Sequence, residues 1–260
     1  DYKLGFSSGI YIDLPDIHIS TTGNNSNPCT FFAASGYPTG IPRAAFITLG
    51  PNALNFHVSN IYFGNSSGAP FDAAGYGQGS PLTSQLIGLS ILSGATNITV
   101  QGCSFRNLRQ NIIAEVGSYN VFVNNCYSDR TWLDSYAINS TNIIFIGNRS
   151  QGIESNAGLS AVIGTGYIFT TNGTSTVNIF GNEMQMLHGT STTENRGCVH
   201  CANTTNVFIE QNNFYQGHVH LEACDQGRVN RNTFVDGGPK ASLFLNNSSY
   251  FPIVNNVFVN

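Results

Sequence analysis

The sequence predicts an all-β chain that coils into a single parallel β-helix, and two observations carry that prediction. A short phrase, made of a turn residue, an apolar strand and an Asn-x-aromatic ending, recurs from residue 97 onward. The phrases are rich in Val, Ile, Phe and Thr and are separated by Asn, Gly and Ser, and no apolar stretch keeps the period of a helix. Such recurrence is typical of stacked units that bury their apolar faces against one another.

The central apolar residue of each phrase sets the register of the repeat. The anchors are Val100, Val123, Phe145, Ile179, Ile209, Val229 and Ile253. The steps between them indicate a basic turn of about 22 residues and two enlarged turns, which end at Ile179 and Ile209. A weaker copy over residues 55–63 precedes Val100 by nearly twice that length, and we expect it to be two turns away. This turn length favours a β-helix over a leucine-rich repeat or a propeller.

Two further columns follow from this register. The third residue after each anchor is a cysteine in the first two turns, Cys103 and Cys126, and an asparagine in the next five. We expect these asparagines to form a buried ladder of hydrogen bonds, since neighbouring strands lie about 4.8 Å apart. They are Asn148, Asn182, Asn212, Asn232 and Asn256. Two residues further on we expect an inward stack, interrupted by Ser128 and Ser150, of Phe105, Met184, Phe214, Phe234 and Phe258.

With these columns, residues 55–260 resemble the pectin-lyase-like right-handed parallel β-helices. That superfamily includes pectate lyases, polygalacturonases, inulin fructotransferases and phage tailspike depolymerases, and the tailspike polysaccharide depolymerases are the most similar in style. The polygalacturonase signatures Asn-Thr-Asp, Gly-His-Gly and Arg-Ile-Lys are missing from the sequence. The resemblance implies a polysaccharide partner, no cofactor, a homotrimer and a location that is extracellular or on a virion surface, but it implies no single reaction.

Length and composition narrow the class of protein. The 260 residues suffice for one domain over residues 1–260, of which 1–50 are expected to form less regular first turns or a cap. Charged residues make up 9% of the chain and the net charge is -4, so the sequence disfavours a nucleic-acid or anionic-membrane partner. No stretch has the length and apolarity of a membrane span. Because the chain starts without Met and ends on a strand, we expect it to be part of a longer protein.

The six cysteines do not form the pattern of a disulfide-rich domain. Cys103 and Cys126 share a column in consecutive turns, so they could form a disulfide or remain as two buried thiols. The buried thiols are the simpler interpretation.

Both enlarged turns gain their extra length between the ladder asparagine and the next strand, over residues 151–158 and 188–197. Insertions at the same point of adjacent turns project from one edge of a coil and can form the wall of a groove. Tolerated surface decoration is the alternative interpretation.

Two histidine-bearing segments follow the second insertion and lie one turn apart, since His200 and His220 are separated by the same interval as the anchors Ile209 and Val229. Strand alternation places the apolar residues of these segments toward the core and their polar residues outward. The outward set consists of Cys198, His200, His218, His220 and Glu222. Phe244 falls in the same outward column one turn later. The sequence therefore predicts an outward cluster of imidazoles and a carboxylate beside an insertion that carries Glu194 and Arg196.

This cluster is the first candidate site, because imidazole can transfer protons near neutral pH and paired carboxylates carry out glycoside hydrolysis. The predicted catalytic residues are Glu222, Glu194, Asp225, His200 and His220. The predicted substrate contacts near them are His218, Arg196, Phe244 and Tyr215. A solvated polar face without a function is the alternative interpretation.

A metal site is a further alternative, with Cys198, His200, His218 and His220 as possible zinc ligands. A flat sheet face rarely completes a tetrahedral shell, so we predict no metal.

A second candidate site surrounds Trp132, the single tryptophan of the chain, because an exposed tryptophan flanked by carboxylates suits a carbohydrate subsite. The residues assigned to it are Trp132, Asp129, Arg130, Asp134 and Glu154. A tryptophan that covers one end of the core is the alternative.

The sequence thus predicts a carbohydrate-active β-helix that binds a polysaccharide and cleaves it, as a glycoside hydrolase rather than a lyase. A non-catalytic glycan-binding adhesin, or a structural segment of a viral or surface spike, is the alternative.

Overall fold

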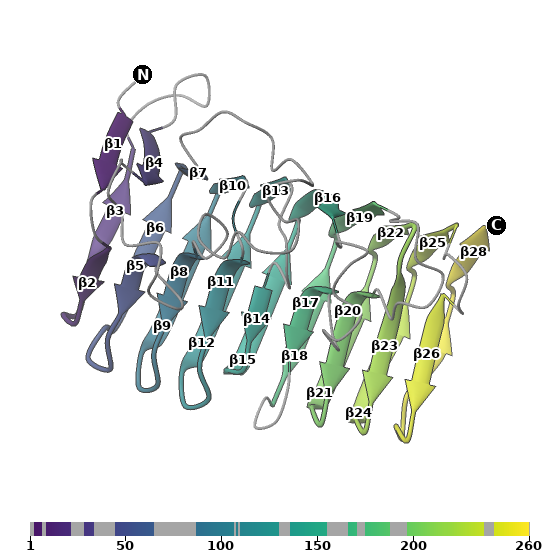
Figure 1. The fold of residues 1–260 in the computed structure, drawn as a ribbon. Helices are drawn as coiled ribbons and strands as arrows, with labels where there is room; N and C mark the ends of the chain where they lie inside the picture. Colours follow the sequence, from purple (N-terminus) through teal and green to yellow (C-terminus); the bar gives the residue numbers. More distant parts are fainter. Residues whose placement is uncertain are drawn as a thin grey trace, which may run out of the picture.

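The computed structural model describes residues 3–6, 9–21, 29–33, 45–64, 87–106, 108, 110–129, 136–154, 166–170, 175–187, 197–236 and 242–259. These residues form 28 strands in three parallel sheets of 10, 9 and 9 strands, named sheets A, B and C below. The chain visits A, B and C in that order in every coil, so strands of successive coils lie side by side along one axis (Figure 1). The all-β parallel β-helix predicted from the sequence is confirmed.

Sheet A contains the strand that follows the ladder asparagine in each coil. Its strands are β1 (Lys3–Phe6), β4 (Cys29–Ala33), β7 (Ile61–Gly64), β10 (Ser104–Arg106), β13 (Tyr127–Asp129), β16 (Arg149–Glu154), β19 (Glu183–Leu187), β22 (Asn213–Tyr215), β25 (Thr233–Val235) and β28 (Val257–Val259). Its inward column is the aromatic stack predicted from the sequence, in which Phe214 and Phe234 lie 5.1 Å apart between ring centroids. Ser128 and Ser150 interrupt the stack, and Ser128 accepts a hydrogen bond of 2.7 Å from the buried Asn111 side chain.

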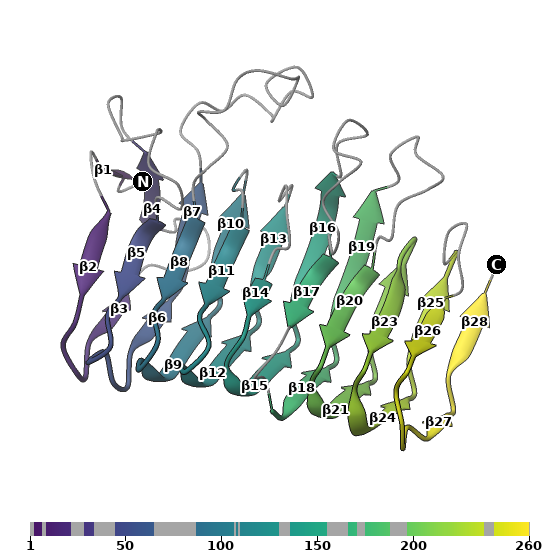
Figure 2. The ribbon, with the colours of Figure 1, turned by 60° about the horizontal axis from the view of Figure 1, so that its bottom comes forward.

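Sheet B follows sheet A in each coil and is shown from its own side in Figure 2. Its strands are β2 (Ile10–Ile12), β5 (Ala45–Leu49), β8 (Ile87–Ile91), β11 (Gln110–Ala114), β14 (Tyr136–Ile138), β17 (Gly166–Thr170), β20 (Gly197–Ala202), β23 (His218–Glu222) and β26 (Leu243–Asn246). The connections from sheet A to sheet B include residues 155–165 and 188–196, which lie outside the described residues. Both insertions therefore come at the same point of the coil, as predicted, although residues 151–154 belong to β16 and Gly197 to β20.

Sheet C contains the anchor residues. Its strands are β3 (His18–Ser20), β6 (His57–Ser59), β9 (Thr96–Gln101), β12 (Tyr119–Asn124), β15 (Thr141–Ile146), β18 (Val177–Phe180), β21 (Thr205–Glu210), β24 (Asp225–Asn230) and β27 (Ile253–Val254). All the anchors pair in one continuous column, which confirms the predicted register.

One expectation for the start of the chain is wrong. Val58 pairs directly with Val100, so the segment between them forms one turn with a long insertion and not two turns. Strands β1 to β5 all lie before residue 50 and pair in parallel with the strands that follow, so residues of the first 50 also contribute strands to the coil.

Asparagines make the corner between sheets C and A, as predicted. Asn212 illustrates the pattern: its amide group donates to the carbonyl oxygen of Ile179 at 2.9 Å and to the side-chain oxygen of Asn232 at 2.9 Å. The same Asn232 oxygen accepts from the Asn212 backbone N–H at 3.0 Å. Asn148, Asn182 and Asn232 repeat these contacts, so the buried polar groups of this corner satisfy one another from coil to coil.

In the two coils that precede Asn148, cysteines occupy the position of the ladder asparagine. Cys126 lies 3.5 Å from the carbonyl oxygen of Val100, and Cys103 lies 3.7 Å from that of Val58, the positions that asparagine amides bind in later coils. Both cysteines are free, so of the two alternatives the buried thiols are confirmed.

A second, exposed ladder follows the start of sheet C, and the sequence patterns did not predict it. Asn97, Asn120 and Asn142 each donate to the side-chain oxygen of the preceding rung at 2.7 to 2.8 Å. These three residues have φ between 55° and 60°, a left-handed conformation that asparagine tolerates better than most residues. Asparagine therefore both turns the chain here and ties neighbouring coils together.

None of the described residues forms a helix with the length and apolarity needed to cross a membrane.

Candidate functional site

The first candidate site lies on the outer face of sheet B, where β20, β23 and β26 run side by side. Alternation along these strands buries Val199, Cys201, Val219 and Leu221 in the core, as predicted. The register aligns His200 with His220 and His220 with Phe244, so three rings whose side chains the structure describes occupy one outward column. Glu222 follows His220 by two residues and therefore lies on the same face.

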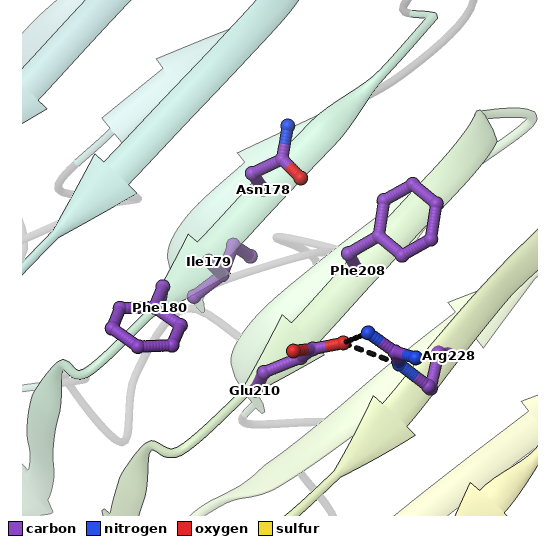
Figure 3. Close-up of a pocket in the computed structure, with 6 residues that line it drawn as sticks. All are labelled: Asn178, Ile179, Phe180, Phe208, Glu210 and Arg228. Carbon is purple, nitrogen blue, oxygen red and sulfur yellow. Dashed lines mark hydrogen bonds and ion pairs between the residues drawn. The ribbon is translucent and has the colours of Figure 1, made fainter.

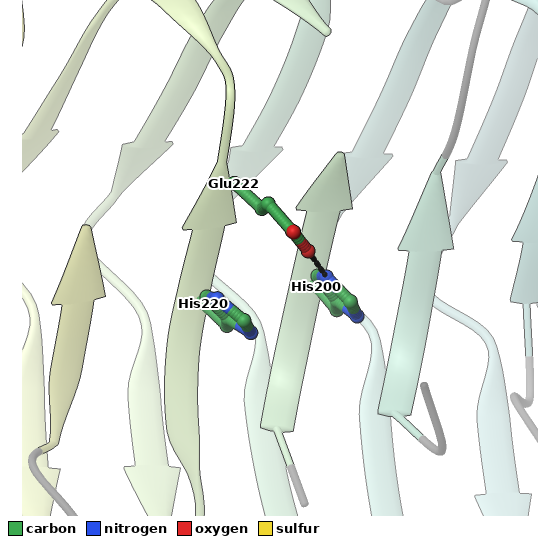
Figure 4. A group of neighbouring side chains, drawn as sticks. All are labelled: His200, His220 and Glu222. Carbon is green, nitrogen blue, oxygen red and sulfur yellow. Dashed lines mark ion pairs between the residues drawn. The ribbon is translucent and has the colours of Figure 1, made fainter. Parts of the chain in front are cut away.

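The rings of this column pack tightly. His200 and His220 stack face to face, with centroids 4.5 Å apart and an interplanar angle of 7° (Figure 4). Phe244 packs edge-on against His220 at 5.1 Å and remains 46% exposed. The column is thus sheltered between coils but open at its Phe244 end.

Glu222 reaches across to the neighbouring coil. Its carboxylate oxygen lies 3.5 Å from Nε2 of His200, as Figure 4 shows. The Glu222 side chain is 46% exposed, whereas that of His200 is 12% exposed. The structure therefore pairs a carboxylate that solvent can reach with an imidazole that is largely sheltered.

Burial sets the charge of this pair. The pKa of His200 is lowered from 6.5, first by burial and then by the nearby His220 ring, while Glu222 opposes the shift. His200 is accordingly neutral at neutral pH and can accept a proton, and the Glu222 carboxylate can stabilise the imidazolium that results. This is the arrangement of an acid–base pair.

Two members of the predicted outward set are placed differently. A β-bulge between Gly197 and Val199 leaves Cys198 out of the pairing and sets His218 opposite Gly197. Cys198 is fully buried, with its sulfur 3.8 Å from the carbonyl oxygen of Met184, so its predicted outward position is wrong. His218 lies beside His220 but is 6% exposed, which leaves little of it for a ligand.

Two predicted partners of Glu222 lie on other sheets. Asp225 is the first residue of β24 in sheet C, beyond the corner that follows β23, and accepts a hydrogen bond of 2.8 Å from Ser249. Tyr215 ends β22 and pairs with Val235 in sheet A. Proximity in sequence suggested both residues, but the corners of the coil direct them to different faces.

The remaining predicted residues of the first site, Glu194 and Arg196, lie outside the described residues. The same is true of Arg130, Trp132 and Asp134 in the second candidate site, and of the side chain of Glu154, whose backbone ends β16. Asp129 is described and forms an ion pair of 3.1 Å with Arg106 on the outer face of sheet A. Asp129 therefore belongs to a different face from the histidine column.

Of the possible zinc ligands named from the sequence, His200 and His220 lie close together, and Glu222 lies beside them. Cys198 is buried in the core and lies apart from this group. The ligand atoms of His200, His220 and Glu222 all lie within 4.8 Å of one another.

An open hollow of about 220 Å³ on sheet C was not predicted (Figure 3). Phe180 and Phe208 flank it, and an ion pair between Glu210 and Arg228 lies beside them. These residues belong to three successive coils and to two columns of the repeat, in which Phe180 pairs with Glu210 and Phe208 pairs with Arg228.

No protein-family model matches this sequence, and no curated protein matches it. Among solved structures, the chain is similar to the catalytic domain of a GH87 alpha-1,3-glucanase in complex with tetrasaccharides, with 12% identity, a TM-score of 0.43, and coverage of 99% of this chain and 62% of that chain. It is also similar to the Streptococcus pneumoniae surface protein and adhesin PfbA, with 9% identity, a TM-score of 0.36, and coverage of 97% and 92%. The chain thus spans about 62% of the length of the glucanase domain.

Proposed function

We propose that this β-helix binds a polysaccharide along the outer face of sheet B and cleaves it there as a glycoside hydrolase. The observation that carries the proposal is the pair formed by the exposed Glu222 carboxylate and the sheltered, neutral His200 imidazole, 3.5 Å apart on the face that bears the ring column. Such a pair can move a proton to or from a substrate oxygen.

An exposed aromatic ring and the strand spacing of this face also support glycan binding. The 46% exposed ring of Phe244 offers a flat apolar surface for the face of a sugar ring, beside the polar groups of Glu222. Neighbouring strands are spaced by about 4.8 Å, which is close to the length of one pyranose unit. A chain of sugars that runs along the axis of the coil would therefore meet about one strand per sugar.

Hydrolysis through paired carboxyl groups requires a second carboxyl group, about 5 Å away in retaining enzymes and about 6.5 to 9.5 Å away in inverting ones. We assign this role to Glu194, which precedes β20 by three residues and belongs to the insertion that enters this sheet. Arg196, next to β20, is assigned to substrate binding.

The alternative function is glycan binding without cleavage, as in an adhesin. It is favoured by one observation: among the described residues, Glu222 is the only carboxylate of the cluster. Both functions use the same face, so an activity assay separates them.

The test measures new reducing ends when the chain is incubated with capsular and lipopolysaccharide glycans. We expect Glu222→Gln to lower the rate by about 10² to 10⁴, the usual contribution of a general acid or base, and Glu194→Gln to lower it as well. Glu183→Gln is the matched control, because Glu183 is 44% exposed on sheet A and should leave the rate unchanged.

Each other outcome has a definite meaning. Cleavage that survives both Glu222→Gln and Glu194→Gln would refute the site assignment. Glycan binding without cleavage would establish the adhesin, and a product with the absorbance of an unsaturated uronate would establish a lyase.

A further inference from the structure

The histidine column and Glu222 form a ligand set as well as an acid–base pair. The nitrogen atoms of His200 and His220 and an oxygen atom of Glu222 lie within 4.8 Å of one another on a single outer face (Figure 4). In the part of the chain that the structure describes, no other group of three His, Cys, Asp or Glu side chains comes this close. Two imidazoles and one carboxylate are the protein ligands of many zinc sites that keep a position open for water or substrate.

We propose that His200, His220 and Glu222 bind one divalent transition-metal ion of the zinc class, with water in the remaining coordination positions. This site does not depend on glycan cleavage, because it uses the side chains as ligands and needs no substrate.

The register of the strands preorganises this set. His200 and His220 are directly paired residues of neighbouring strands, and Glu222 lies two residues beyond His220, so all three side chains leave the sheet in the same direction. Backbone pairing between β20 and β23 fixes the three Cα positions without any contribution from the metal. The ion would therefore bind to a folded scaffold and order only the ends of three side chains.

Metal binding requires a limited movement of the rings. In a tetrahedral zinc site with bonds of about 2.0 to 2.1 Å, ligand atoms lie about 3.4 Å apart, somewhat closer than the limit of 4.8 Å in the structure. The lone pairs of imidazole lie in the ring plane, so two rings stacked at 7° cannot point at one ion. Rotation about the last side-chain torsion, which is broad for histidine, turns the rings toward a shared centre.

The nearby cysteines do not compete for the ion. Cys198 and Cys201 of β20 are fully buried and Cys224 is 1% exposed, and all three pack into the core on the opposite side of the strands. The ligand set is therefore nitrogen and oxygen, without sulfur. Co²⁺ in such a site gives visible d–d absorption but lacks the charge-transfer band of a thiolate ligand.

The chain also contains an internal control. His18 and His57 pack against each other on the outer face of sheet C, with centroids 4.3 Å apart and ring planes tilted by 40°, and the structure shows no third ligand group with them among the described residues. Two histidines alone should bind the metal much more weakly than two histidines and a carboxylate.

The test titrates chelator-treated full chain with Co²⁺ and Zn²⁺ and follows visible absorption and heat. We expect one equivalent of metal per chain, and a loss of affinity of at least about tenfold in His200→Asn, His220→Asn and Glu222→Gln, since even outer-shell changes cost that much. His57→Asn should leave the affinity unchanged. Metal binding that these three variants do not weaken, a thiolate charge-transfer band, or the absence of binding would each overturn the proposal.

A second measurement needs no variant and is independent of folding defects. In the unmodified chain, Co²⁺ should shift the ring-proton NMR signals of His200 and His220 and leave those of His18 and His57 in place. Shifts of the His18 and His57 signals alone would contradict the assignment. Reducing-end assays play no part in either measurement, so failure of the metal site and failure of the hydrolase are separable.

Discussion

Two histidine pairs occur on the described part of this molecule, one on sheet B and one on sheet C, and they share the same strand register, although the sheet B rings are stacked at 7° and the sheet C rings are tilted at 40°. In each, a histidine pairs with the histidine of the next coil, and the residue two positions further on contacts the first ring across the strands. Glu222 Oε2 lies 3.5 Å from His200 Nε2, and Ser59 Oγ lies 3.5 Å from His18 Nε2. In the third coil of each column stand Phe244 and Thr99.

The comparison separates what the fold provides from what the site adds. Parallel pairing alone brings the imidazoles to within 4.3 to 4.5 Å of one another, so a histidine pair is not in itself a functional signal. Burial and the neighbouring histidine lower the pKa of His57 just as they lower that of His200. The sheet B pair differs because a carboxylate and an exposed aromatic ring replace a hydroxyl and a methyl-bearing side chain, and these two replacements carry the proposed chemistry.

The largest expected effect comes from giving the sheet C pair its missing carboxylate. Ser59→Glu places a carboxylate where Glu222 stands relative to its own pair, so the chain should bind a second equivalent of Co²⁺. Titration by visible absorption measures the stoichiometry. Ser104→Glu adds the same charge on sheet A and should leave it at one equivalent. An unchanged stoichiometry in Ser59→Glu would show that the shared backbone geometry is not sufficient.

A smaller effect is expected when the sheet B column loses its aromatic ring. Phe244→Thr makes this column resemble the sheet C column and removes an aromatic contact of about 0.5 to 1.5 kcal/mol, so glycan affinity should fall about two- to tenfold. Equilibrium binding to an immobilised glycan measures the change. Phe208→Thr on sheet C serves as the control. An equal loss of glycan affinity in both variants would contradict a binding site on sheet B.

The smallest effect concerns protonation. Glu222 raises the pKa of His200 against burial and His220, so Glu222→Gln should lower that pKa further, while the pKa of His57 stays in place. NMR titration of the ring protons measures both. Because the pKa of His200 is lowered in the folded chain, the unfolded chain binds more protons below pH 6.5, and acid should weaken the fold as the pH falls from there to the folded-state pKa. A higher pKa of His200 in Glu222→Gln would contradict this account.

Much of the fold could be predicted because stacking ties each residue to its counterpart one coil away. The anchors, the asparagine ladder and the aromatic stack all follow from counting along the chain. Counting failed at Val58, because an insertion of nearly one turn length imitates a second turn. The exposed ladder was also missed, although Asn97, Asn120 and Asn142 each stand three residues before an anchor, because the count followed the buried columns alone.

The site could be predicted only in part. Counting by the local anchor step correctly placed His200 beside His220 and Glu222 on their face, but the bulge at Cys198 broke the count for Cys198 and His218. Asp225 and Tyr215 lie close to Glu222 in sequence but on different sheets, because two residues are enough for the chain to turn from one sheet to the next. Phe180 and Phe208 line the hollow on sheet C from different columns, so counting along one column does not bring them together.

The asparagine ladder has a consequence for how such a chain can change length. Asn182, Asn212 and Asn232 make the same contacts, so removing one whole coil between two of them would rejoin equivalent partners and keep the remaining residues on their own faces. Deleting one residue within β21 would instead turn Phe208 and Glu210 inward and Val207 and Ile209 outward. Gain or loss of sequence in this molecule is therefore tolerated in units of a coil or within the insertions, and hardly anywhere else.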